Sequence, residues 1–175
     1  NGMQISDRAL AKEISARILQ GRAVGFYSDF PVKGNLPEEL LIKQEYRKLK
    51  ETLPGIAVLE KKPEKAMEGI LHLYPKILSV GIGCRRGVEK EKIEQKIRSV
   101  LGRGGWKSDQ IGVLASIDRK ADEKGILDFA SEYGIPFRTY TAGELNTVKQ
   151  VTSSSVFVKN ITGTDNVCER AALLA

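Results

Sequence analysis

The chain has 175 residues, of which 41% are apolar and 29% are charged, and its formal net charge is +6. Its apolar share and its 17 glycines exclude global disorder, and the lack of a membrane-length apolar run or a signal-peptide pattern predicts a cytoplasmic protein without membrane contact. Scattered aromatic residues disfavour nucleic acid as a partner in spite of the positive charge, and the single histidine excludes a Ser-His-Asp triad or a multi-histidine metal site.

The front part of the chain, residues 1–75, is predicted to be a small α/β region. Apolar residues at helical spacing predict two helices, over 6–20 and 37–50, and Pro37 suits the first turn of the second. Short β-favouring runs predict three strands, over 23–27, 56–60 and 70–74. His72 lies in the last of these strands, where we expect it to be paired or at an edge rather than catalytic.

The rear part, residues 76–175, alternates between strands and helices. The strands are expected over 77–83, 111–116 and 136–140. The helices are expected over 89–101, 121–133 and 165–175, with a helical turn over 144–148. The segment 155–161 is ambiguous, because its β-branched residues favour a strand while it lacks the alternation of a half-buried strand. This order predicts an α/β fold, with a mainly parallel sheet flanked by helices and preceded by the smaller α/β region.

A glycine-rich segment with two arginines, residues 81–87, leaves the first rear strand and enters a helix. Open α/β sheets bind ligands beyond the carboxyl ends of their strands, where free N–H groups and arginine side chains favour an anion. The alternative is a tight turn with solvated arginines. A glycine is missing at position 86 for the dinucleotide fingerprint, which disfavours a nucleotide. The predicted binding residues are Gly81, Gly83, Cys84, Arg85, Arg86 and Gly87.

A second polar cluster follows the second rear strand, which a parallel sheet would place beside the first. Ser116 and Asp118 are expected to cap or to bind, and Lys120 is expected to bind an anion. Asp118 and Glu123 are candidate catalytic carboxylates, whereas Asp122 is more typical of a helix start.

A third cluster lies where the last helix begins. Thr164 or Asp165 is expected to cap this helix, and Thr164 is also a candidate binding residue. Glu169 lies about one turn inside an otherwise apolar helix, so we expect it either to pair with Arg85 or Lys120 or to be catalytic.

The two cysteines, Cys84 and Cys168, lie far apart in the sequence, which predicts reduced thiols rather than a disulfide framework. No base is evident beside either residue. They are therefore interpreted as small core residues rather than as nucleophiles.

Together, these clusters resemble the carboxy-terminal domain of the CbiG family of cobalamin-biosynthesis proteins and its stand-alone relative CobE. The front part, with GRAVGFYSDFP at 21–31, is similar to the linker domain that precedes it in CbiG. The family's amino-terminal domain has no counterpart in this sequence, and one more strand is expected after the last helix. The matching segments are VGIGCRRG at 80–87, LASIDRKADEKGIL at 114–127, TYTAGEL at 139–145 and GTDNVCERAALLA at 163–175.

The resemblance implies a cobalt-precorrin-5A hydrolase, which opens a lactone and releases acetaldehyde during corrin-ring construction. It implies a cobalt-containing tetrapyrrole as ligand, no cofactor or metal site of the protein's own, and other enzymes of the corrin pathway as partners. The hypothesis is that Arg85, Arg86 and Lys120 hold carboxylates of the substrate, while Glu123 or Glu169 handles the proton. Two other functions stay open: a non-catalytic corrinoid-binding module, and a nucleotide-binding α/β domain.

Overall fold

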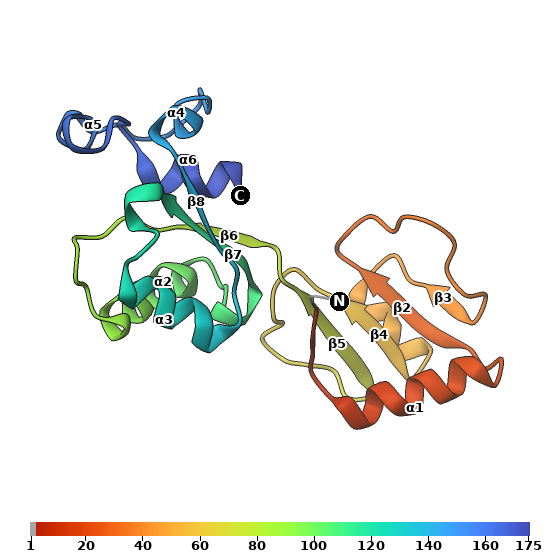
Figure 1. Ribbon diagram of the computed structural model, residues 1–175. Coiled ribbons are helices and arrows are strands. Elements are labelled where there is room, and N and C mark those ends of the chain that lie inside the picture. The colour runs from red at the N-terminus through yellow and green to blue at the C-terminus, as the bar shows by residue number, and fades with distance from the viewer. Residues whose placement is uncertain (1–2) are drawn as a thin grey trace. The chain divides into compact units, whose positions relative to one another are not determined.

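The computed structural model describes residues 3–175 and divides into two compact units. Asn1–Lys76 form the front unit and Ile77–Ala175 form the rear unit. Both units contain a mostly parallel sheet with helices packed against it (Figure 1). The predicted α/β class is therefore confirmed. Across residues 3–175, no helix combines the length and the apolar character that a membrane crossing requires.

The front unit has a five-stranded sheet in the order β1-β5-β4-β2-β3, in which only β1 runs antiparallel to its neighbour. Helix α1 (Arg8–Leu19) begins at Asp7, whose carboxylate accepts hydrogen bonds from two backbone N–H groups of the first turn. Its buried Ile14 packs against the sheet. The strands are β1 (Met3–Ile5), β2 (Val24–Ser28), β3 (Leu40–Ile42), β4 (Gly55–Val58) and β5 (Ile70–Pro75).

The predicted helix over 37–50 is wrong. Its first half is strand β3, which pairs in parallel with β2, and its second half is the 3₁₀ helix η1 (Tyr46–Glu51). Leu49 of η1 is fully buried against the sheet, and a Cβ at Gly25 would come within 3.0 Å of its side chain. The apolar residues that suggest one amphipathic helix therefore belong to two elements, the edge strand β3 and the 3₁₀ helix η1, which contact the sheet in different ways.

The rear unit is built on a parallel sheet of three strands in the order β6-β7-β8. Its strands are β6 (Leu78–Gly81), β7 (Ile111–Ile117) and β8 (Phe137–Tyr140). The two longer helices, α2 (Lys90–Arg103) and α3 (Lys124–Tyr133), contribute to one apolar core, and the side chains of α4 (Ala142–Leu145) and α6 (Val167–Leu174) form a second core with β7 (Figure 1). The remaining short helices are η2 (Ser108–Gln110), η3 (Asp118–Lys120) and α5 (Val156–Thr162).

Two helix starts in the rear unit differ from the sequence prediction. Helix α3 begins at Lys124 rather than near 121, because η3 takes up the residues just after β7. Helix α6 is capped by Asn166, whose side chain accepts the Glu169 N–H, and not by Thr164 or Asp165. The ambiguous segment is helical, since Ser155 caps α5 by accepting the Val158 N–H.

Candidate functional site

The glycine–arginine loop, residues 82–87, follows β6 and is held to the start of α3 by one buried carboxylate. Glu123 is only 3% exposed; its Oε1 accepts the Gly87 N–H at 2.6 Å and its Oε2 accepts Lys120 Nζ at 2.8 Å. Gly87 has φ +77°, a conformation that favours glycine. The first and second predicted clusters are thus brought together by direct contacts.

The bonds that Glu123 accepts also decide its chemistry. The hydrogen bond from Lys120 lowers the pKa of the Glu123 carboxyl from its ordinary value, and the Gly87 N–H acts in the same direction against the opposing effect of burial. A carboxylate with a lowered pKa and both oxygens engaged is a weak general base. The geometry gives Glu123 and Lys120 a positioning role in the loop.

The two arginines of the loop differ in their surroundings. Arg86 is exposed; it donates to Asp122 Oδ2 at 2.9 Å and to the Arg119 carbonyl at 3.1 Å. Arg85 is also exposed, and among residues 3–175 it forms no hydrogen bond or ion pair. An exposed ion pair such as Arg86–Asp122 exchanges partners at little cost. Arg85 is therefore the cation of this loop that is most available to an external anion.

Gly81, the last residue of β6, and Gly83 in the loop are explained by packing inside the rear unit. A Cβ at Gly81 would lie 1.7 Å from the Cys168 carbonyl oxygen, and a Cβ at Gly83 would lie 2.8 Å from the Cys168 Sγ. The first turn of α6 therefore occupies the space over both glycines. Their predicted role in letting a ligand approach stays a prediction, because the close neighbour here is the protein's own helix.

The cysteines fit the interpretation as non-nucleophiles but not entirely as core residues. Cys84 is half-buried against the core, whereas Cys168 is exposed overall with its Sγ against Gly83. Desolvation raises the pKa of both thiols, which favours the protonated form.

Two predicted binding residues have fully buried side chains. Ser116 Oγ donates to the Ile82 carbonyl at 2.6 Å and so fixes the start of the glycine–arginine loop. Thr164 Oγ1 is buried without a hydrogen-bond partner among the described residues. Neither hydroxyl faces solvent, so in this conformation an external ligand does not reach them. Asp118, by contrast, is exposed, and its carboxylate accepts the Arg119 N–H at 2.7 Å.

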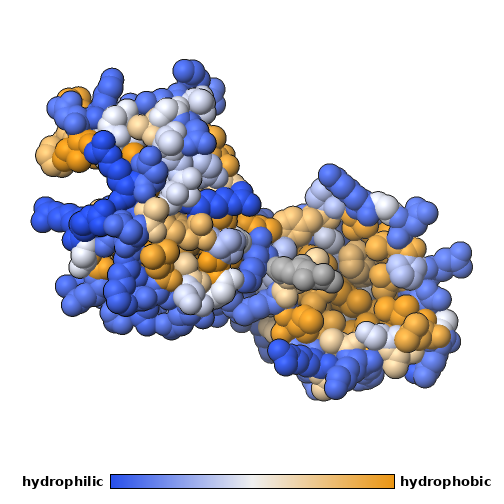
Figure 2. All heavy atoms as spheres, in the orientation of Figure 1, coloured by the Kyte–Doolittle hydropathy of each residue, from blue (hydrophilic) through white to orange (hydrophobic). Residues whose placement is uncertain are grey.

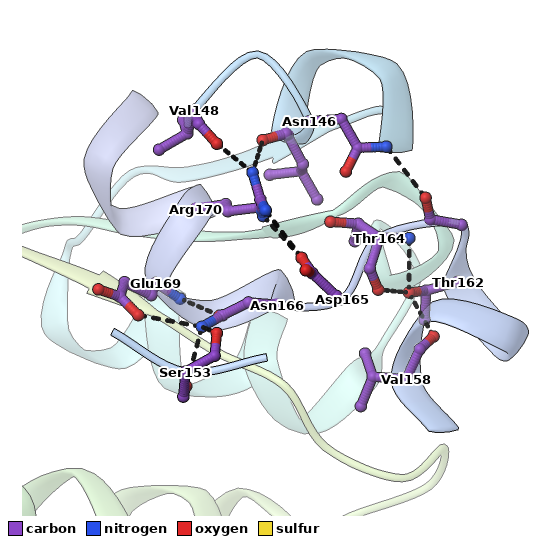
Figure 3. A network of polar contacts seen from close by, with 12 residues as sticks. Asn146, Val148, Ser153, Val158, Thr162, Thr164, Asp165, Asn166, Glu169 and Arg170 are labelled. Carbon is purple, nitrogen blue, oxygen red and sulfur yellow. Dashed lines mark hydrogen bonds and ion pairs between the residues drawn. The ribbon is translucent and has the colours of Figure 1, made fainter. Parts of the chain in front are cut away.

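Glu169 lies in a polar network at the start of α6 (Figure 3). Its half-buried carboxylate accepts the Thr152 N–H at 2.9 Å, the Thr152 hydroxyl at 3.0 Å and the Asn166 side-chain amide at 3.0 Å. The expected pairing with Arg85 or Lys120 is wrong, because these three neutral donors come from the segment before the helix and from its cap.

Sequence reasoning missed Arg170, which stands next to Glu169 and is only 8% exposed. Its guanidinium donates to Asp165 Oδ1, with the shorter bond at 2.8 Å, and to the carbonyls of Leu145 and Val148 (Figure 3). An arginine within an alanine- and leucine-rich helix is the signal that would have found it. It ties the loop after α4 to α6.

Both units match models of known protein families. A family model described as "Cobalamin synthesis G C-terminus" matches residues 78–175, and one described as "Cobalamin biosynthesis central region" matches residues 1–75. A cobalt-precorrin-5A hydrolase from Priestia megaterium is 37% identical over 117 residues, which cover 66% of this chain and 31% of that protein. A probable cobalt-precorrin-5A hydrolase from Methanocaldococcus jannaschii is 28% identical over 116 residues, covering 65% and 36%.

A crystal structure of CobE, a protein from the cobalamin (vitamin B12) biosynthetic pathway, is also similar. It is 34% identical, with a TM-score of 0.53, over 55% of this chain and 69% of that one. The matched stretches amount to about a third of the length of the two hydrolases.

Proposed function

Because the chain belongs to the CbiG family of cobalamin-biosynthesis proteins, we propose that it forms part of a cobalt-precorrin-5A hydrolase of the cytoplasm. In that reaction water opens a lactone of the substrate and acetaldehyde is released. The cobalt enters with the substrate, so the protein needs no cofactor of its own, and other enzymes of the corrin pathway are its expected partners. The rear unit would bind the carboxylate side chains at the rim of this tetrapyrrole.

The proposal rests on one observation: Arg85 is unpaired within residues 3–175, and it lies on a loop whose backbone is held by buried hydrogen bonds. The Glu123–Gly87 hydrogen bond and the Ser116–Ile82 hydrogen bond hold the loop's backbone, while Arg85 stays exposed without a partner among the described residues. This arrangement presents a guanidinium to solvent at the carboxyl edge of the parallel sheet, where ligands of such sheets bind. A guanidinium forms two parallel hydrogen bonds to a carboxylate.

For the proton we propose Glu169 rather than Glu123. Opening of a lactone by water requires a base that takes a proton from the attacking water. Glu123 is ion-paired with Lys120, holds the Gly87 N–H and has a lowered pKa, so it fits this task poorly. Glu169 is half-buried, and its carboxylate accepts hydrogen bonds from the neutral donors of Thr152 and Asn166 rather than from a lysine. Asp118 is the exposed alternative.

A second function, a corrinoid-binding module without catalysis, is favoured by one specific observation. Of the three candidate bases, Glu123 is committed to the loop, and Glu169 already accepts hydrogen bonds from three donor groups. A rear unit with a free arginine and no free buried base would bind a corrinoid without turning it over.

Titration with dicyanocobyrinic acid, a corrinoid with free carboxylates, tests the binding step through its visible spectrum. We expect the chain to bind it, and an Arg85→Ala/Arg86→Ala variant to bind it at least tenfold more weakly. Acetaldehyde release from cobalt-precorrin-5A then separates the enzyme from the module. Loss of release in Glu169→Gln with binding retained supports the base, and unchanged release removes Glu169 from the mechanism. No binding by the unaltered chain contradicts the proposal.

A further inference from the structure

The outer face of α5 is apolar and uncovered. Val156 is 77% exposed, Phe157 is 74% exposed and Ile161 is 52% exposed, and their spacing places them within one half of the helix surface. Figure 2 shows hydrophobic atoms gathered on the lobe where Figure 1 places α5, bordered by hydrophilic atoms. Single exposed apolar residues are ordinary, but three on one short helix form a patch that invites an explanation.

This patch belongs to a folded helix that is fixed to the rear unit. The Val158 side chain packs against the core between α6 and the sheet, and the Ser155 N–H donates to the Asp165 carbonyl at 2.9 Å. At the other end, the Asn146 amide donates to the Gly163 carbonyl at 3.0 Å. The exposed face is therefore held in place before any partner arrives, which reduces the ordering cost of binding.

A cation lies directly beside the patch. Arg119 donates through Nη1 to the Ile161 carbonyl at 2.5 Å, and its own carbonyl accepts from Arg86. Arg119 is exposed and forms no ion pair with the described residues. Hydrogen bonds thus link the glycine–arginine loop through Arg119 to the backbone of the last turn of α5, the helix that carries the apolar face.

We propose that α5 and Arg119 form the second wall of the tetrapyrrole site. The face of Val156, Phe157 and Ile161 packs against the apolar part of the ring, and Arg119 binds a carboxylate at its rim. This step rests on the proposed function, because the occupant must be apolar in its middle and anionic at its edge. A protein partner fits less well, since three side chains beside a cationic rim offer much less than the roughly 800 Å² that each partner buries in a stable interface.

The test compares variants of the full chain in titrations with two corrinoids, dicyanocobyrinic acid and its amide counterpart dicyanocobinamide. Phe157→Ser is expected to weaken binding of both probes by about tenfold, because it removes an apolar contact that does not depend on charge. Arg119→Gln is expected to weaken binding of the carboxylate probe only. Leu173→Ser, at a residue that is 61% exposed on α6, is the matched control and should leave both affinities unchanged. Unchanged denaturation midpoints show that the variants are folded.

The possible outcomes distinguish a failure of the second wall from a failure of the proposed function. If Arg85→Ala/Arg86→Ala weakens binding while Phe157→Ser does not, the second wall is wrong and the function stands. If Phe157→Ser leaves binding intact but abolishes a concentration-dependent self-association, the patch is an interface between copies of this chain. If Arg119→Gln weakens both probes equally, Arg119 acts only by supporting α5. If the unaltered chain binds neither probe, the proposed function is contradicted along with the wall.

Discussion

The two units both contain parallel strands, but the polar groups near the strand ends are used differently. In the front unit Asp29 follows β2, and its two carboxylate oxygens accept the Tyr27 hydroxyl at 2.9 Å and the Glu60 N–H at 2.7 Å. The buried His72 has its own partner, since its Nε2 lies 2.7 Å from the Tyr46 hydroxyl. In the rear unit Arg85 has no partner among residues 3–175.

This contrast shows which unit is prepared for a ligand. Asp29 after β2 is satisfied inside the front unit, whereas the rear unit uses buried contacts to hold a loop that leaves the Arg85 guanidinium open. The same sheet position therefore serves the stability of one unit and recognition in the other. Four changes test this difference.

The largest effect is expected from Gly81→Ala in the rear unit. The new Cβ would meet the Cys168 carbonyl at 1.7 Å, so α6 must move, and we expect a loss of about 3 kcal/mol of stability. Fluorescence of Trp106, the single tryptophan, reports denaturation of this unit. Gly102→Ala is the control, because nothing lies within 4 Å of its Cβ. Equal midpoints for the two variants would contradict the packing role of Gly81.

Glu123→Gln should loosen the glycine–arginine loop. The change weakens two charge-assisted hydrogen bonds and leaves the mostly buried Lys120 without its carboxylate, which should cost about 2 kcal/mol. Denaturation followed by Trp106 measures this loss. Hydrogen exchange of the Gly87 amide should speed up as well. If the Gly87 amide of Glu123→Gln exchanged as slowly as in the unaltered chain, Glu123 would not be what holds the loop.

Arg85→Ala should affect binding without affecting stability. An exposed arginine without a partner within residues 3–175 contributes little to folding, whereas a charge-assisted bond to a carboxylate contributes about 1.5 kcal/mol, or about tenfold in affinity. Spectral titration with dicyanocobyrinic acid measures this loss. Arg47→Ala, at an exposed arginine of η1 in the front unit, is the control. Equal affinities of the two variants would remove Arg85 from the site.

Acid should weaken the two units in different pH ranges, with the smallest effects in this series. Burial lowers the pKa of His72 below its ordinary value of 6.5, so its contribution to the front unit is complete above that pH and is lost as the pH falls through the lowered pKa. The hydrogen bond from Lys120 lowers the pKa of Glu123 below 4.5, so the rear unit loses its contribution only in more acidic solution.

Urea denaturation at several pH values measures both effects, with tyrosine absorbance followed alongside Trp106 fluorescence. The front unit should weaken first on acidification, and His72→Asn should remove its dependence near neutral pH. If the rear unit lost stability at a higher pH than the front unit, the assignment of these effects to His72 and Glu123 would be wrong.

The sequence predicts the rear unit well because its signals are local. Buried β-favouring runs and helices with one apolar side agree with β6, β7, β8, α2 and α3. The front unit fails at 37–50 because pairing with β2, a contact distant in the sequence, overrides helical propensity. Helix α5 stays ambiguous in the sequence for a related reason, since its exposed Val156 and Phe157 give no core-facing pattern.

The candidate site is predictable as a location but not as a set of contacts. Strand ends and arginines point to the glycine–arginine loop, and the structure adds that Glu123 holds it and that Arg86 is paired with Asp122. Arg119 is missed, because only the tertiary structure brings its guanidinium to α5. The sequence does not predict the hydrogen-bond partners of Glu169 either, since Thr152 lies in an irregular segment before α5.

The most direct test of the account is an NMR titration of the full chain with dicyanocobyrinic acid. We expect backbone amide shifts to concentrate on residues 83–87, 118–120 and 156–161 of the rear unit, while the amides around Asp29 and His72 in the front unit stay unchanged. Shifts confined to the front unit, or spread evenly over both units, would contradict the claim that the rear unit's open arginine edge is the ligand site.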